Sequence, residues 1–333
     1  MDLFQIINDI AKVDPEVYDR FDSRRAAFRN FIGFGKKVTA TALPLAVSTL
    51  FTKAYGQNTG ALPPAVIATL NLALQLEYLE FFYYDTALNS SALGLTAEER
   101  RAFEIIRNDE LLHINTLRGT LGTNAIAPLT RASFDYTTSQ NKTRTPVLPP
   151  LVALGGTTDP TTGQFTDKAV FLLAAQQFVD TGVRAYKGGA PSLNTNTTKD
   201  ILEAALNIHS VEARHSSRIR SLRRGGVQSV TAPKSWITPD ETDMNATMPL
   251  PNNGVANSPA AVGPYLAGLP ATGTPSASFP NEKNTTQATL DVQGVGGLVS
   301  ATAGAEAFDE PLNAETVKAI AKNFAAVPAA LFN

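Results

Sequence analysis

The sequence predicts an all-α protein, with a four-helix bundle between an arm and an irregular tail. Four segments carry apolar residues at the three-to-four spacing of a buried helix face. The connections between them are short, then long, then short, and the last third of the chain is instead rich in Pro, Gly, Ser, Thr and Asn. We therefore divide the chain into an arm (1–60), a bundle (61–226) and a tail (227–333).

The arm is typical of an export leader, because Arg24 and Arg25 precede an apolar stretch at residues 38–51. Paired arginines, a modest apolar segment and small residues after it indicate a twin-arginine signal, which predicts a periplasmic or exported protein. The alternative is an amphipathic helix that stays on a cytoplasmic protein. No apolar run reaches the roughly 18 residues of a bilayer-spanning helix, so we expect no transmembrane span.

The first two helices are predicted over residues 63–89 and 96–122. The first opens with a Pro-Pro pair, which the start of a helix tolerates. Thr96 and Glu99 have the spacing of a capping box at the start of the second. The connection between them is short, which predicts an antiparallel hairpin.

The third and fourth helices are predicted over residues 166–187 and 197–223, with Thr166 as N-cap of the third and GGAP (188–191) as its stop. The long connection 123–165 can cross back over the bundle, so helices two and three can run parallel. Short, long, short is the order of ferritin-like four-helix bundles.

The tail predicts extended coil with weak β-like patches such as residues 288–297. One short helix is expected near its end, capped by Asn313 or Thr316. The arm and the tail are also where we expect a homo-oligomer to form, if there is one.

Three of the predicted core faces are apolar except near their middle, where acidic residues and histidines stand: Glu77, Glu110, His113, Glu212 and His215. Buried carboxylates that converge repel one another unless a cation compensates them. Carboxylate oxygen and imidazole suit iron or manganese, and Glu-x-x-His places both on one helix face. The pattern predicts a site for one or two such ions; the alternative is a metal-free cluster of buried salt bridges.

The third helix lacks the expected fourth carboxylate, since Val179 stands in the middle of its core face. Gln176 could coordinate through its carbonyl oxygen, although it carries no charge. Asp180 is the nearest carboxylate, and its alternative role is an ion pair with Arg184 one turn later. The site could hold one ion, a distinct pair, or none.

Other candidates are weaker. Tyr84 shares a face with Glu77 and could donate a hydrogen bond or an electron near the site, or be a core tyrosine. Glu80 is expected at the rim, and His209 at a helix interface. The chain has no cysteine, which excludes thiolate chemistry, and its net charge of −2 does not favour nucleic acid as a partner.

Five segments resemble the ferritin-like domain family that includes plant desiccation-related proteins and many bacterial exported proteins: LEYLEFFYYDTAL, DELLHINTL, QQFVDTGVRAYKGGAP, HSVEARHSSRIRSL and AFDEPLNAETVKAI. The leader, with DSRR and FGKK, is similar to those of bacteroidete members. The resemblance implies a ferritin-like bundle with a di-iron site at the five acidic and histidine residues. It also implies glutamate at the position of Val179, so the chain departs from the family there.

Two functions fit the sequence. The first is metal-dependent redox, in which a di-iron or di-manganese oxidoreductase acts as a ferroxidase or consumes peroxide or dioxygen. The second is a structural, interaction or stress-protection protein, in which the bundle is a scaffold that has lost its metal.

Overall fold

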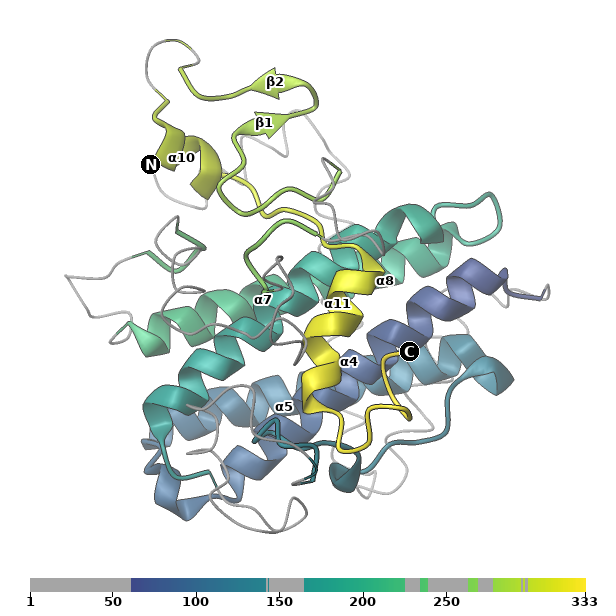
Figure 1. Ribbon diagram of the computed structural model, residues 1–333, viewed down its shortest axis with the longest axis vertical. Helices are drawn as coiled ribbons and strands as arrows, with labels where there is room; N and C mark the ends of the chain where they lie inside the picture. Colours follow the sequence, from purple (N-terminus) through teal and green to yellow (C-terminus); the bar gives the residue numbers. More distant parts are fainter. Residues whose placement is uncertain are drawn as a thin grey trace, which may run out of the picture. The chain divides into compact units, whose positions relative to one another are not determined.

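The computed structural model describes residues 61–141, 143, 165–224, 234–238, 263–268, 278–294, 296 and 299–333, all within the compact unit Tyr55–Asn333. The predicted arm and its export signal lie outside these residues. Four long helices form the bundle (Figure 1): α4 (Pro64–Leu88), α5 (Ala97–Leu121), α7 (Lys168–Leu193) and α8 (Lys199–Arg223). The predicted all-α bundle is thereby confirmed.

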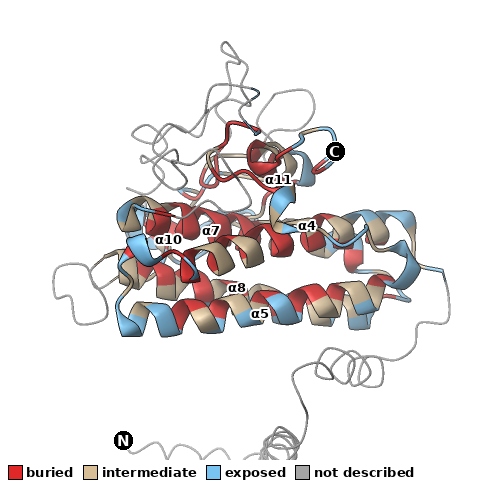
Figure 2. Cartoon of the chain, turned by 90° about the horizontal axis from the view of Figure 1, so that it is seen from below, coloured by how far each residue is buried: buried red, intermediate tan, exposed pale blue. Residues whose placement is uncertain are grey.

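The helices form two layers, with α4 and α7 in one and α5 and α8 in the other (Figure 2). Tyr83 stacks on Phe171, while Thr69 lies beside Gly189, so α4 and α7 are antiparallel. Because α4 also pairs with α5 as a hairpin, α5 runs parallel to α7. This is the arrangement predicted from the order of connection lengths.

Local sequence signals set most helix ends. The predicted capping box of α5 is present, since Thr96 Oγ1 accepts from Glu99 N and Glu99 Oε2 accepts from Thr96 N. The prediction for α7 was wrong at both ends. Its N-cap is Asp167, which accepts from Val170 N, and the helix continues past residue 187 to Leu193.

The glycines at 188 and 189 serve close packing and do not end α7. A Cβ at Gly188 would lie 1.8 Å from the carbonyl oxygen of Leu312, and one at Gly189 would lie 2.9 Å from Thr69 Cγ2. A glycine inside a helix costs about 1 kcal/mol relative to alanine. At these two positions the absence of a side chain lets α4 and the tail approach α7 closely.

The described residues of the tail, α11 (Ala314–Ala321) among them, lie over the layer of α4 and α7 (Figure 2). The predicted terminal helix is α11, capped at Asn313, and it packs across α4 and α7. A hairpin of β1 (Thr286–Gln287) and β2 (Leu290–Asp291) overlaps the predicted β-like patch 288–297 through β2, whereas β1 precedes the patch.

The remaining elements are short. They are α10 (Ala301–Glu306) and 3-10 helices at Ser91–Leu93, Gly122–Asn124, Arg131–Ser133 and Lys322–Phe324. An isolated bridge between Phe134 and Ala325 ties the long connection to the C-terminal segment. By length and hydropathy α4 is the one helix among the described residues that could also cross a membrane. In this bundle it is a core helix, and half of its apolar window is buried.

Candidate metal centre

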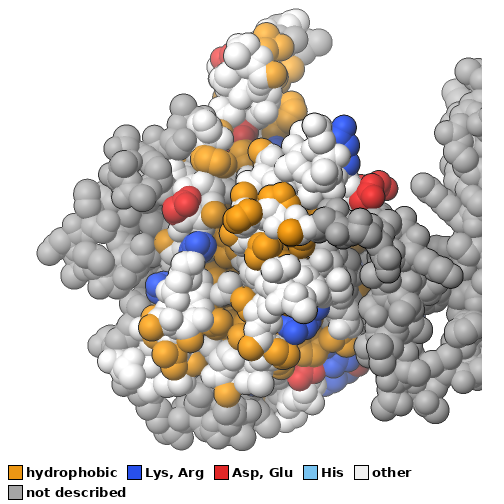
Figure 3. Space-filling view, turned by 90° about the vertical axis from the view of Figure 1, so that its right-hand side faces the viewer, with side chains coloured by type: hydrophobic (Ala, Val, Ile, Leu, Met, Phe, Trp, Pro, Cys, Tyr) orange, Lys and Arg blue, Asp and Glu red, His pale blue; other side chains and the backbone are white. Residues whose placement is uncertain are grey.

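Three helices bring four buried side chains together in the middle of the bundle. Glu77 comes from α4, Glu110 and His113 from α5, and Glu212 from α8, and one ligand atom from each lies within 4.8 Å of the others. All four are buried, and Glu110 is 0% exposed. No histidine shows among the described residues on the face drawn in Figure 3. The cluster could therefore hold a metal ion away from bulk water.

His113 Nδ1 is the centre of this cluster. It lies 3.0 Å from Glu77 Oε2, 3.1 Å from Glu110 Oε2 and 3.2 Å from Glu212 Oε1. A ring nitrogen carries at most one proton, so it can donate to only one of these three carboxylates. At least two carboxylate oxygens at this point are left without a donor from His113.

His215 contacts the second oxygens of two of these carboxylates, those of Glu110 and Glu212. Its Nδ1 is 3.2 Å from Glu110 Oε1 and 3.8 Å from Glu212 Oε2. Its Nε2 lies 3.1 Å from Asp109 Oδ2, a carboxylate that the sequence did not single out. A carboxylate that contacts one ring nitrogen is the usual support for a histidine whose other nitrogen binds metal.

Several polar atoms at the cluster are buried and have no aligned hydrogen bond within the described part of the chain: Glu110 Oε1, both carboxylate oxygens of Glu212, and His215 Nδ1. Native proteins seldom leave such atoms unpaired, because each costs about 1–3 kcal/mol. Carboxylate oxygens and imidazole nitrogens are the donors that iron and manganese accept. The residues therefore fit a metal ion.

Burial and mutual repulsion set the protonation of the cluster in its metal-free form. Burial raises the pKa of Glu77 to about 8, although His113 opposes this. Burial would also raise the pKa of Glu212, but Glu212 faces both histidines, and their hydrogen bonds and charges lower it below its ordinary value. The carboxylates outweigh burial at His215 and raise its pKa to about 12.

The fold and the cluster agree with the comparison to protein families. Residues 65–224 match the family model of the ferritin-like domain. The matched span runs from the start of α4 to the residue that caps α8, so it covers the whole bundle. Comparisons with curated proteins and with solved structures found no significant match. The narrower resemblance to desiccation-related and bacteroidete proteins stays a prediction.

Glu80 lies inside the ferritin-like bundle and not at its rim, so that prediction was wrong. It is 5% exposed, and Tyr84 Oη donates to its Oε2 at 3.1 Å. Its Oε1 would be 3.3 Å from a Cβ at Gly182, which is also 3.6 Å from Glu212 Oε2. Burial and the charge of Glu212 raise the pKa of Glu80 well above its ordinary value.

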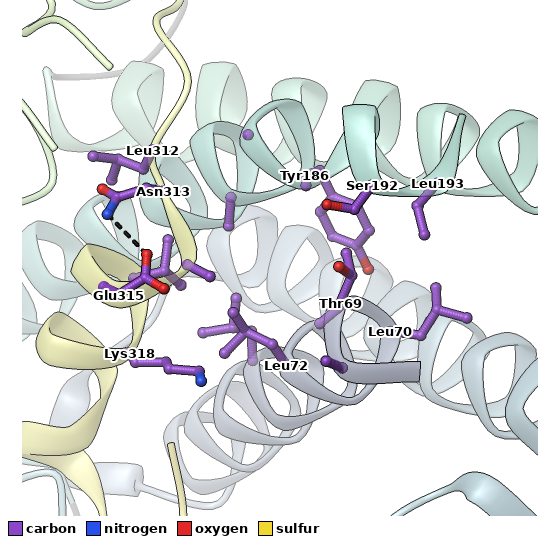
Figure 4. A pocket seen from close by; sticks show the side chains of 18 of the residues that line it. Thr69, Leu70, Leu72, Tyr186, Ser192, Leu193, Leu312, Asn313, Glu315 and Lys318 are labelled. Atoms are coloured by element: carbon purple, nitrogen blue, oxygen red, sulfur yellow. Dashed lines mark hydrogen bonds between the residues drawn. The ribbon is translucent and has the colours of Figure 1, made fainter. Parts of the chain in front are cut away.

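Two tyrosines contact the carboxylates of α4. Tyr84, predicted as a neighbour of the site, reaches Glu80 as described above. Tyr186 of α7, which the sequence analysis did not single out, donates its hydroxyl proton to Glu77 Oε1. Tyr186 also lines a pocket of about 300 Å³ between α4, α7 and the tail, on the side of the bundle shown in Figure 4.

Asp180 and Gln176 form their ion pair and hydrogen bonds with residues outside the cluster. Asp180 Oδ2 pairs with Arg220 Nη2 at 2.5 Å and accepts from Tyr265 Oη at 2.7 Å. Gln176 Nε2 donates to the same tyrosine oxygen at 2.9 Å, and its Oε1 accepts from Arg223. The predicted ligand role of either residue finds no support in this geometry, and the predicted partner of Asp180, Arg184, is replaced by Arg220.

Arg184 binds the tail. Its guanidinium is 0% exposed and lies 2.7 Å from Glu282 Oε1. It also donates to backbone carbonyl oxygens of five tail residues: Pro264, Leu266, Pro280, Glu310 and Pro311. Arg184 belongs to the DTGVRAY segment that carries part of the family resemblance, and its role in this structure is to hold the tail against α7.

A depression of about 410 Å³ between α5 and α8 is lined by one residue of the cluster, His215. Asp109 and His215 line it, together with Arg101, Arg214 and Arg218. Asp109 is one-third exposed, whereas His215 is buried. The pair is thus the place where the cluster comes nearest to solvent in this part of the described chain.

Proposed function

We propose that the bundle binds one or two iron or manganese ions at Glu77, Glu110, His113, Glu212 and His215, and that it oxidises ferrous iron with peroxide or dioxygen. The observation that carries this proposal is the convergence of three buried carboxylates on His113 Nδ1. Without a cation, such a cluster is costly. The match to the ferritin-like domain supports the proposal.

Bound iron would supply the redox chemistry, since two ferrous ions release the two electrons that, with two protons, reduce one hydrogen peroxide to two waters. The chain's own residues hold and shield the ions. Asp109 orients His215 through Nε2, and the Tyr186 hydroxyl donates a hydrogen bond to Glu77 Oε1. Since the carboxylates are buried, bulk water is excluded from them, which strengthens their attraction for a cation.

A non-catalytic scaffold is the second candidate, and Val179 favours it. This residue is 0% exposed on α7, so the third helix offers no carboxylate at that position. In this case the cluster would be a network of buried Glu–His pairs, and the tail held by Arg184 would be the working surface.

Metal content distinguishes the two. The protein would be purified from iron-rich and from chelated medium, and iron and manganese would be measured per chain. The redox proposal predicts metal in the first sample, its loss in the double variant E212A/H215A, and ferrous oxidation that disappears with it. Negligible metal in both samples, with unchanged melting temperature, would contradict it and favour the scaffold.

Export is a separate proposal. It rests on Arg24, Arg25 and the apolar stretch at 38–51. N-terminal sequencing of the protein isolated from its native cells tests it, because a start after the apolar stretch shows cleavage. A start at Met1 would contradict export by this signal.

A further inference from the structure

The cluster has two halves that share two carboxylates. Glu110 directs Oε2 towards His113 and Oε1 towards His215. Glu212 does the same, with Oε1 on the side of His113 and Oε2 on the side of His215. Glu110 and Glu212 could therefore each contribute an oxygen to an ion in either half of the cluster.

The halves differ in their third carboxylate. On the side of His113, Glu77 Oε2 completes the set at 3.0 Å from Nδ1. On the side of His215, α7 provides none, because Val179 is apolar and Asp180 is paired with Arg220. Three buried atoms there have no aligned hydrogen bond to any described residue: Glu110 Oε1, Glu212 Oε2 and His215 Nδ1. This half therefore lacks negative charge from α7.

Glu80 lies next to this half. It follows Glu77 by one turn of α4, so both side chains project from neighbouring positions of the helix into the bundle. Its Oε1 and Glu212 Oε2 approach the same point on α7, where Gly182 has no side chain. Tyr84 donates a hydrogen bond to Glu80 Oε2, whereas Oε1 lies on the side of Gly182 and Glu212.

We propose that Glu80 is a carboxylate ligand of a second metal ion on the side of His215, in place of the carboxylate that α7 lacks, and that Gly182 keeps the space for it. This inference rests on the proposed function, because it requires that the cluster binds metal. It explains why α4 carries a second buried carboxylate next to Glu212. A side chain at position 182 would press on Glu80 Oε1 at 3.3 Å.

The test is anaerobic titration of the metal-free full chain with Mn²⁺, followed by metal analysis after gel filtration and by electron paramagnetic resonance. The wild-type protein is expected to bind two ions with a spin-coupled signal. E80Q, which keeps the shape of the side chain, should bind one ion, with the affinity for the second reduced at least tenfold and the coupled signal lost. G182A should weaken the second ion in the same direction, and it does so without removing a carboxylate.

E203Q is the matched control, because Glu203 is an exposed glutamate of α8, and it should bind two ions. E77Q should instead weaken the ion on the side of His113. A wild-type protein that binds two ions while E80Q also binds two with unchanged affinity would overturn the role of Glu80 alone. One ion in the wild type would also overturn it and leave the proposed function standing, whereas none would overturn both. Circular dichroism checks folding, and E80D, a shorter carboxylate, replaces E80Q if that variant does not fold.

Discussion

Asp109 Oδ2 lies 3.1 Å from His215 Nε2, on the side of the ring away from Glu110 and Glu212. A carboxylate accepts and cannot donate, so this contact holds the proton on Nε2 when the ring is neutral. The lone pair of Nδ1 is then directed at the shared carboxylates, where a cation would be bound. Asp109 is therefore a positioning residue for the half of the cluster that contains His215.

Replacing Asp109 with alanine should lower the metal affinity of this half by about 10–100-fold, because the ring loses its orienting partner. Titration of the metal-free protein with Mn²⁺ measures this. D109N should lose less, since its amide oxygen can still accept from Nε2. E98A is the control, because Glu98 lines the same depression and contacts Arg218 but not the cluster. Equal affinities in D109A and the wild type would contradict the positioning role.

Arg184 should be a main anchor of the tail. R184M removes the partner of the buried Glu282 and the donors of several tail carbonyls, and breaking such a pair costs about 3–5 kcal/mol. Urea denaturation should show this loss, and limited proteolysis should cut the tail sooner. R214M, at an exposed arginine of α8, should change stability by less than about 0.5 kcal/mol. An R184M protein as stable as R214M would show that the tail is held by other contacts.

The metal-free protein should lose stability as pH rises from mildly acidic to mildly basic. The pKa of Glu77 is about 8 in the folded chain against an ordinary 4.5, so between these values the folded state holds a proton that the unfolded state releases. Stability therefore falls across that window. The pKa of His215, about 12 against 6.5, acts in the same direction above pH 6.5.

The melting temperature of the chelated protein at about pH 6 and about pH 8.5 measures this effect, to which Glu77 alone should contribute about 2–3 kcal/mol in unfolding free energy. E77Q removes the contribution of Glu77 and should show a smaller fall. Saturating Mn²⁺ should reduce the loss of stability with rising pH further, because a bound cation favours the ionised carboxylates. A rise in stability with pH in the chelated protein would contradict the assignment.

Helical periodicity in the sequence predicted those residues of the cluster that are the polar exceptions on an otherwise apolar helix face. Glu77, Glu110 and Glu212 each interrupt such a face, so their convergence follows once the bundle is assumed. The same method misplaced Glu80, because a residue three positions after Glu77 points about 60° away on an ideal helix. In a bundle of four helices the buried sector of α4 is wide enough to include both.

Contacts between distant segments could not be read from the sequence. Asp180 and Arg184 have the spacing of a helical ion pair, yet each pairs with a residue on another element, Arg220 and Glu282. The reason is burial: α7 is enclosed by α8 on one side and by the tail on the other, so each charge takes the partner that faces it. The position of Asp109 beside His215 is likewise a property of helix pairing.

The glycine at 188 gives the sharpest test of how the tail is seated on α7. G188A should destabilise the protein by about 3 kcal/mol or more, because the added Cβ would lie 1.8 Å from the Leu312 carbonyl oxygen and the backbone has to move. G119A is the matched variant. Gly119 lies in α5 with nothing within 4 Å of the added methyl group, so the change should stabilise the helix by about 0.5–1 kcal/mol. Opposite signs in urea denaturation would follow from this packing, whereas stabilisation by both alanines would show that Leu312 does not lie against α7 in solution.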